Sequence, residues 1–141
     1  MASKLQNPGV RLMDTSEVLA NDTCPMTALN ATVGTLPANI ITGGSFVTCV
    51  STNATPGTQT TRTAVQMYAD DPTAAIGNAY VLRICNGSGS GTLTLAGGTG
   101  VTVTGTATVA NATFRDFNVV YSGTVAAPVM TITNIGTGTY S

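Results

Sequence analysis

The sequence predicts an all-β fold: an antiparallel β-sandwich or small barrel, jelly-roll-like, with one short helix and an extended N-terminal arm. Segments of alternating apolar and polar residues recur about every 8–12 residues between turns rich in Gly, Asn and Pro, as in sandwiches and barrels. The 141 residues include 16 glycines and are rich in threonine, whose branched side chain favours strands. A single segment has a clear helical pattern.

Residues 1–45 are predicted to form the arm, and residues 46–141 the β-sandwich domain. The first part contains apolar residues without a sustained period, and it holds many of the charged residues, including Lys4, Arg11 and Asp14. An ordered arm of this kind needs another surface to lie on. We therefore expect its apolar side chains to bind a partner: Leu5, Val10, Leu12, Val18 and Leu19.

The β pattern begins with a strand predicted over Phe46–Val50, followed by a loop rich in Thr, Asn, Pro and Gly that runs to about Thr60. The spacing then predicts a helix of about two turns over Thr61–Asp70, because it starts with threonine, continues with helix formers and stops at Asp71-Pro72. Three residues would share the face that packs against a sheet: Ala64, Met67 and Tyr68.

The next strand is predicted over Ala79–Cys85, where apolar residues alternate. Its core face is predicted to hold Tyr80, Leu82 and Ile84, because the opposite face would bury Arg83.

The C-terminal part predicts a hairpin of Thr92–Leu95 and Val101–Val103 around a Gly97–Gly100 turn, with Leu and Val inward and Thr outward. Gly105 interrupts the alternation where a bulge or corner is expected. Further strands are predicted over Thr106–Val109, Phe114–Tyr121 and Val129–Thr133, and one face would carry Phe117, Val119 and Tyr121.

The charge content is low and excludes several functions. Only 8% of residues are charged and the formal net charge is -1, against about a quarter charged in an average soluble domain. The few Lys and Arg residues are spread singly, so no basic patch for nucleic acid or a membrane surface is expected. No stretch reaches the roughly 18 apolar residues that span a bilayer. So few charges favour a surface that is largely covered by partners.

The sequence offers little catalytic chemistry. The absence of histidine excludes Ser/His/Asp and Cys/His sites and histidine-liganded metals within one chain. Asp70-Asp71 is either a solvated helix end or a catalytic pair, and the first interpretation is favoured. The Gly87–Gly91 and Gly97–Gly100 segments lack the Lys-Ser/Thr of a phosphate loop and are predicted turns. We expect no enzyme, no cofactor and no metal.

The remaining reactive residues also favour a structural protein. An odd number of widely spaced cysteines predicts buried free thiols in a protein made in a reducing cytosol, at Cys24, Cys49 and Cys85. Asn-x-Ser/Thr triplets occur, but no export signal precedes them, so glycosylation is not expected. Arg115 and Asp116 either pair across a subunit contact or flank their strand as exposed ends.

The patterned segment from Leu93 to Val109, followed by Asn111–Tyr121 and Val129–Thr133, resembles the β-domains of tailed-bacteriophage virion proteins. These are capsid decoration (cement) proteins, head fibres and some tail fibres. The resemblance covers residues from about 60 to 141 and is one of composition and pattern. It implies a structural subunit that sits on the outer capsid and clamps neighbouring major capsid proteins.

We therefore expect a non-enzymatic decoration protein, synthesised in the host cytoplasm and located on the outer capsid surface of the virion. Its partners would be the major capsid protein and further copies of itself, with a trimer favoured and a dimer possible, and neither nucleic acid nor membrane. The alternative function is a head-fibre or tail-fibre module that binds host-surface glycans.

Overall fold

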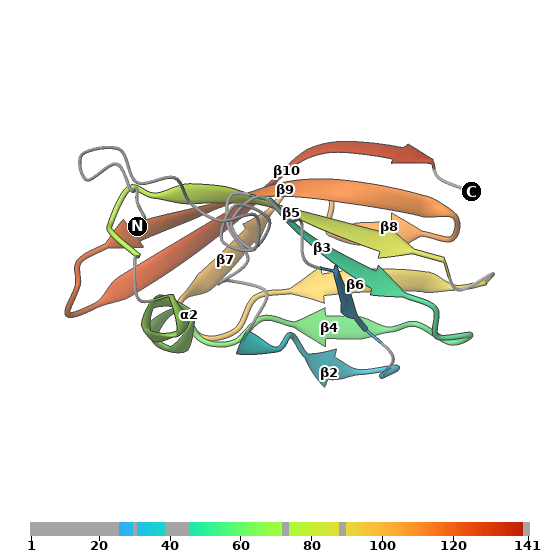
Figure 1. The fold of residues 1–141 in the computed structure, drawn as a ribbon, viewed down its shortest axis with the longest axis horizontal. Helices are drawn as coiled ribbons and strands as arrows, with labels where there is room; N and C mark the ends of the chain where they lie inside the picture. The colour runs from blue at the N-terminus through green and yellow to red at the C-terminus, as the bar shows by residue number, and fades with distance from the viewer. Residues whose placement is uncertain (1–25, 30, 39–45, 72–73, 88–89, 140–141) are drawn as a thin grey trace, which may run out of the picture.

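The computed structural model describes residues 26–29, 31–38, 46–71, 74–87 and 90–139. The chain is almost entirely β, with one short helix, α2 (Ala64–Asp70) (Figure 1). The strands are β1 (Met26–Ala28), β2 (Gly34–Thr35), β3 (Phe46–Ser51), β4 (Thr58–Thr60), β5 (Ala79–Asn86), β6 (Thr92–Ala96), β7 (Val101–Thr104), β8 (Thr108–Ala110), β9 (Thr113–Gly123) and β10 (Pro128–Thr139). The predicted all-β class is confirmed.

The strands form a six-stranded sheet in the order β1-β3-β5-β9-β10-β7 and a four-stranded sheet in the order β2-β4-β6-β8. Both sheets are mixed, which corrects the antiparallel arrangement expected from the sequence. In the six-stranded sheet β1, β3 and β5 are parallel neighbours, and so are β7 and β10. In the four-stranded sheet β2, β4 and β6 are parallel neighbours. Antiparallel pairing is found for β5 with β9, β9 with β10 and β6 with β8.

The parallel pairs arise because the chain crosses between the sheets after each strand from β1 to β8. Successive crossings wind the first six strands into a flattened coil, with β1, β3 and β5 stacked in one sheet and β2, β4 and β6 in the other (Figure 1). The antiparallel strands β9 and β8 then cover the β5 and β6 ends of this coil.

The predicted hairpin of Thr92–Leu95 and Val101–Val103 is wrong for the same reason. Both segments are strands, but β6 lies in the four-stranded sheet while β7 pairs with β10 in the other sheet. The Gly97–Gly100 turn redirects the chain between sheets as it passes the start of α2. A Cβ atom at Gly98 would lie 2.5 Å from the carbonyl oxygen of Thr61, so this close approach requires glycine. Gly105, with a φ of 78°, forms the predicted corner before β8.

The two sheets share one hydrophobic core. The predicted core face of β5 is buried, and so is the predicted face of β9 with Phe117, Val119 and Tyr121. The opposite sheet contributes Leu93, Leu95 and Val109. Alternation of apolar and polar residues therefore identified the inward faces correctly even where the strand partners were not those expected.

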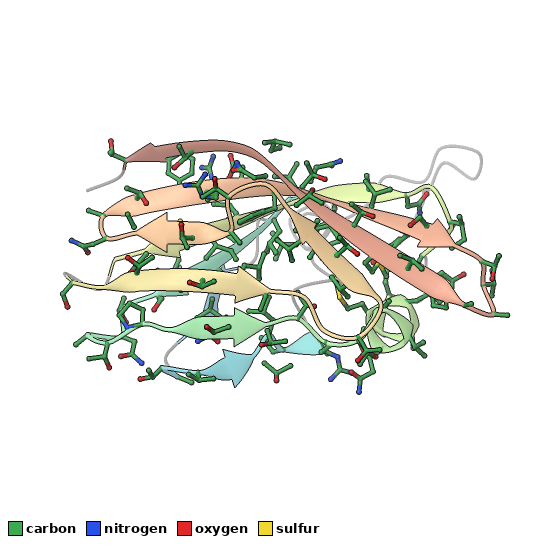
Figure 2. All side chains as sticks on the ribbon, turned by 180° about the vertical axis from the view of Figure 1, so that it is seen from behind. Carbon is green, nitrogen blue, oxygen red and sulfur yellow. The ribbon has the colours of Figure 1, made fainter. Side chains whose placement is uncertain are left out.

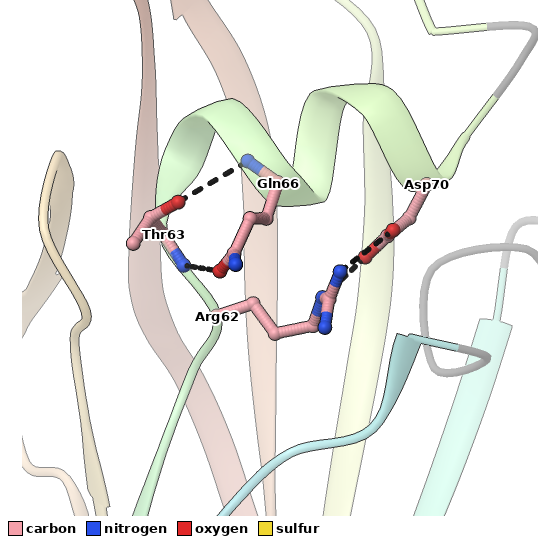
Figure 3. Close-up of polar contacts among 4 residues, drawn as sticks. All are labelled: Arg62, Thr63, Gln66 and Asp70. Atoms are coloured by element: carbon pink, nitrogen blue, oxygen red, sulfur yellow. Dashed lines mark hydrogen bonds and ion pairs between the residues drawn. The ribbon is translucent and has the colours of Figure 1, made fainter.

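The helix α2 begins later than predicted, at Ala64, because Thr63 is its N-cap. The Thr63 side chain accepts a hydrogen bond from the Gln66 amide at 3.2 Å, and the Thr63 amide donates to Gln66 Oε1 at 3.1 Å (Figure 3). This reciprocal capping box satisfies amides that the first turn leaves without helical partners. Ala64 and Met67 are buried and Tyr68 packs against the core, as the spacing predicted.

Part of the predicted arm belongs to the sheets. Residues 26–28 and 34–35 form β1 and β2, and Leu29 and Leu36 are buried in the common core. The loop predicted before Thr60 contains a further short strand, β4, whose Gln59 side chain is buried. Gln59 Nε2 donates to the Ala31 carbonyl at 2.7 Å, so this side-chain amide connects β4 to the segment between β1 and β2 in the preceding turn of the coil.

A second buried amide connects the two sheets. Asn86 ends β5 and is fully buried, and its Nδ2 donates to the carbonyl oxygens of Val109 at 2.9 Å and Gly91 at 3.3 Å. Val109 lies in β8 of the opposite sheet. Because Asn86 has no solvent exposure, its Asn-x-Ser triplet is closed to glycosylation in the folded chain.

Candidate interaction surfaces

The ion pairs on the surface lie within the chain. Arg62 Nε and Nη2 donate to the two carboxylate oxygens of Asp70 at 2.6 and 3.0 Å, which connects the segment before α2 to the end of that helix (Figure 3). Arg83 on β5 likewise donates to both oxygens of Asp116 on β9, at 2.7 and 2.8 Å. These bidentate bonds fix each guanidinium in one orientation. The hydrogen bonding of Arg83 to the Asp116 carboxylate is the main cause that raises the pKa of Arg83.

The other described ionised side chains also have partners in the chain. Arg115 Nε donates to the Thr108 carbonyl on β8 at 2.7 Å, and its Nη1 donates to Asn134 Oδ1 at 2.8 Å. The Tyr121 hydroxyl lies 3.1 Å from Asp71 Oδ2 and donates to it. The expectation that Arg115 and Asp116 flank their strand as exposed ends is corrected, because both are half-buried inside β9 and bond within their own chain. Their pairing across a subunit contact stays a prediction. In the described part of the molecule, every ionised side chain has an intramolecular partner.

The outer surface of the four-stranded sheet carries short uncharged side chains, and we call it the threonine face (Figure 2). Thr58, Thr94 and Thr108 are register partners across β4, β6 and β8, so they form a row perpendicular to the strands. Neighbouring rows add more small residues on the same side. The face consists of Thr35, Thr58, Thr60, Thr92, Thr94, Ala96, Thr108 and Ala110.

The outer surface of the six-stranded sheet is also nearly neutral, and we call it the ion-pair face. Its rows include Val120 opposite Thr131 and Val81 opposite Asn118. The Arg83–Asp116 pair crosses the middle of the face, with side chains that are 32% and 19% exposed. The Arg83 guanidinium carbon lies 3.9 Å from the centre of the Phe114 ring, a cation–π contact that covers the aromatic surface.

Two of the described tyrosines are buried, and the third packs against them. Tyr80 is 7% exposed and Tyr121 is 2% exposed, and their rings contact each other, while Tyr68 packs edge-on against Tyr121. The Tyr80 hydroxyl is buried without a hydrogen-bond partner. Burial raises the pKa of Tyr80, and that of Tyr121 is raised by burial and by Asp71. Neither ring presents a face on which a sugar could stack.

The described cysteines are free and buried, as predicted, at Cys49 and Cys85. Burial raises the pKa of Cys49 to about 12 and also raises that of Cys85. Both are therefore protonated at neutral pH. Within the described ranges no three His, Cys, Asp or Glu side chains gather around one point, and no helix is long and apolar enough to cross a membrane.

The predicted partner-binding residues Leu5, Val10, Leu12, Val18 and Leu19 all lie outside the described residues. Sequence reasoning missed the threonine face as a unit, since Thr58 and Thr60 were assigned to a loop. The Thr-x-Thr alternation around Gln59 was the available signal, but a buried glutamine conceals it. No protein-family model, curated protein or solved structure matches this chain.

Proposed function

We propose that this chain is a non-enzymatic structural subunit of a virion, a capsid decoration protein on the outer capsid surface. The observation that carries the proposal is that the described charges are satisfied within the chain while the threonine face carries only short, uncharged side chains. Such faces can be covered by a partner without desolvating an unpaired charge, which is the main energetic obstacle to burying a surface.

The threonine face is the proposed capsid-facing surface. Threonine offers both a methyl group and a hydroxyl, so it suits a wide, flat contact surface that is uncharged and not strongly hydrophobic when exposed to solvent. Four strands about 4.8 Å apart give a face of roughly 15 Å by 15 Å, which is less than the roughly 800 Å² per partner of a standard stable interface. The arm residues Leu5, Val10 and Leu12, with Val18 and Leu19, supply the remaining contact area in this proposal.

The test is binding to purified capsids that lack the protein. Thr94→Arg places a charge in the middle of the threonine face, and Thr102→Arg places the same charge at an exposed position of the six-stranded sheet. We expect Thr94→Arg to weaken capsid binding at least about tenfold, because an unpaired buried charge costs more than 1.4 kcal/mol. Deletion of residues 1–20 is also expected to weaken capsid binding at least about tenfold, because it removes the apolar contacts of the arm. Thr102→Arg is expected to bind normally.

The outcomes separate the alternatives. Undiminished binding of the deletion variant would remove the arm from the mechanism, and equal effects of the two arginine variants would remove the threonine face. Hundreds of copies per purified particle support a decoration protein, whereas a handful indicate a tail component. Binding to a glycan array without affinity for capsids would favour the head-fibre or tail-fibre alternative.

A further inference from the structure

Among the described strands, the second half of β10 is an open sheet edge. β10 pairs with β9 along its whole length, from Pro128 opposite Gly123 to Thr139 opposite Thr113. On its other side β7 pairs only with Met130–Thr133. No described strand continues this pairing beside residues 134–139, which form the margin of the molecule next to the C label (Figure 1).

This edge lacks the usual protection against strand addition. Natural edge strands are commonly short, charged, interrupted by proline or twisted by a bulge. The edge strands β1 and β2 are short, with three and two residues. By contrast, Ile135–Thr139 contains neither a charge nor a proline, and Ile135 is 57% exposed. One protective feature is present, a register irregularity between Asn134 and Gly136 at the start of the segment, but Gly136–Thr139 pair with β9 in regular register beyond it.

The space beside the edge differs between its two glycines. A Cβ atom at Gly136 would meet nothing within 4 Å, whereas one at Gly138 would collide with the Phe114 ring. The ring therefore fills the space over Gly138, and the space over Gly136 is open. A foreign peptide added to an edge is selected by pockets for its alternate side chains. This edge offers main-chain groups and uncharged side chains, which favours a partner whose only requirement is a matching edge.

We propose that the β10 edge binds the same edge of a second copy of this chain, in antiparallel register about a twofold axis through Thr137. Thr137 then lies opposite Thr137 of the copy, and Gly136 lies opposite Gly138. A twofold contact uses the same patch on both subunits. The edge is neutral, and the nearby charges of Arg83, Asp116 and Arg115 are already bonded within each chain, so the two copies do not repel each other.

The pairing is weak in solution. A free segment of six residues forms fewer hydrogen bonds than the roughly ten of a typical stable interface. We therefore expect a dimer that appears only at high protein concentration and becomes populated where copies are held close together. This inference deepens the self-association part of the proposed function and gives a twofold pair in place of the trimer expected from the resemblance. It is tested without capsids, so the two proposals fail separately.

The experiment uses like and opposite charges at the axis. Thr137→Lys and Thr137→Glu each place two like charges directly opposite one another and are expected to lower the association constant about threefold or more. Mixing the two variants places opposite charges together and is expected to restore association. The control Ala126→Lys adds the same charge at an exposed position of the loop between β9 and β10. Sedimentation equilibrium over a wide concentration range measures each constant.

Cross-linking gives a second, independent readout that does not require the charged variants to fold. In a Cys24→Ser background, where the remaining thiols of Cys49 and Cys85 are buried, Thr137→Cys is expected to form a disulfide-linked dimer under mild oxidation and Ala126→Cys is not. A chain that stays monomeric at all concentrations would overturn the proposal. So would a mixture of Thr137→Lys and Thr137→Glu that associates no better than either alone, or equal cross-linking at both cysteine positions.

Discussion

Replacing Asn86 by aspartate tests whether a single buried amide holds the two sheets together. The change is nearly isosteric, so it leaves packing intact and replaces only the Nδ2 donor by an oxygen. That donor reaches the carbonyl oxygens of Val109 and Gly91, and the residue has no solvent exposure. The variant therefore loses two hydrogen bonds and places a carboxylate oxygen against the carbonyl oxygens of Val109 and Gly91.

The expected destabilisation at pH 7 is about 3–5 kcal/mol. Two lost hydrogen bonds cost about 1 kcal/mol each, and a buried carboxylate without a cation adds a further penalty of a few kcal/mol. A loss of this size lowers the melting temperature by roughly 10–20 °C in a domain of this length. Asn86→Ala is the matched control, because it removes the same donor without introducing a charge and is expected to cost about 2 kcal/mol.

The pH dependence distinguishes the two variants. Burial raises the pKa of the introduced carboxyl above its unfolded value of about 3.9, so the native state holds the proton more tightly than the unfolded state. Stability of Asn86→Asp relative to the natural chain is therefore greatest at low pH, where the protonated acid donates one hydrogen bond, and declines as pH rises above about 4. Urea unfolding between pH 3.5 and 7 measures it. A small, pH-independent loss equal to that of Asn86→Ala would refute the assigned role of this amide.

Three further outcomes are expected from other buried or paired groups. Tyr80→Phe removes a hydroxyl without a partner and is expected to leave the melting temperature unchanged or raise it by a few degrees, whereas Tyr121→Phe loses a hydrogen bond to a carboxylate and costs about 1 kcal/mol. Because the pKa of Cys49 is about 12, about one thiol in ten thousand is ionised at pH 8, and we expect its alkylation to follow the rate of unfolding, as a thiol-reagent time course will show. A double-mutant cycle of Arg83→Met and Asp116→Asn is expected to give a coupling of about 0.5–1 kcal/mol that decreases in high salt.

The sequence predicted β3 and the strands from β5 to β10, because burial leaves a period of two in a strand, but it assigned β1 and β2 to the arm and β4 to a loop. It did not predict the partners, since alternation is the same whether a strand returns beside its predecessor or crosses to the other sheet. Leu93 and Leu95 were rightly assigned to the core, yet the hairpin built on them was wrong. β4 was missed because its buried residue is Gln59, whose side-chain amide is satisfied by the distant carbonyls of Ala31 and Thr32.

The sequence predicted that the chain has interaction surfaces but did not predict where they lie. Low charge content predicted a covered surface, but the pairing of Arg83 with Asp116 and the alignment of Thr58 with Thr94 depend on strand register, which the sequence pattern does not encode. The open half of β10 was not predicted, for a related reason. Its length follows from the pairing with β9, and the predicted strand ended at Thr133, where the covering strand β7 ends.

The crossing of the chain between the sheets has a consequence for the order of assembly. Among described sheet neighbours only β9 and β10 follow one another directly along the chain, whereas pairs such as β1 with β3 or β4 with β6 join segments separated by a full coil. Closing such long loops costs entropy before any contact compensates it, so folding is expected on the millisecond-to-second timescale. We expect the hairpin of β9 and β10 to form first and the turn of the coil that contains β1 and β2 to fold last.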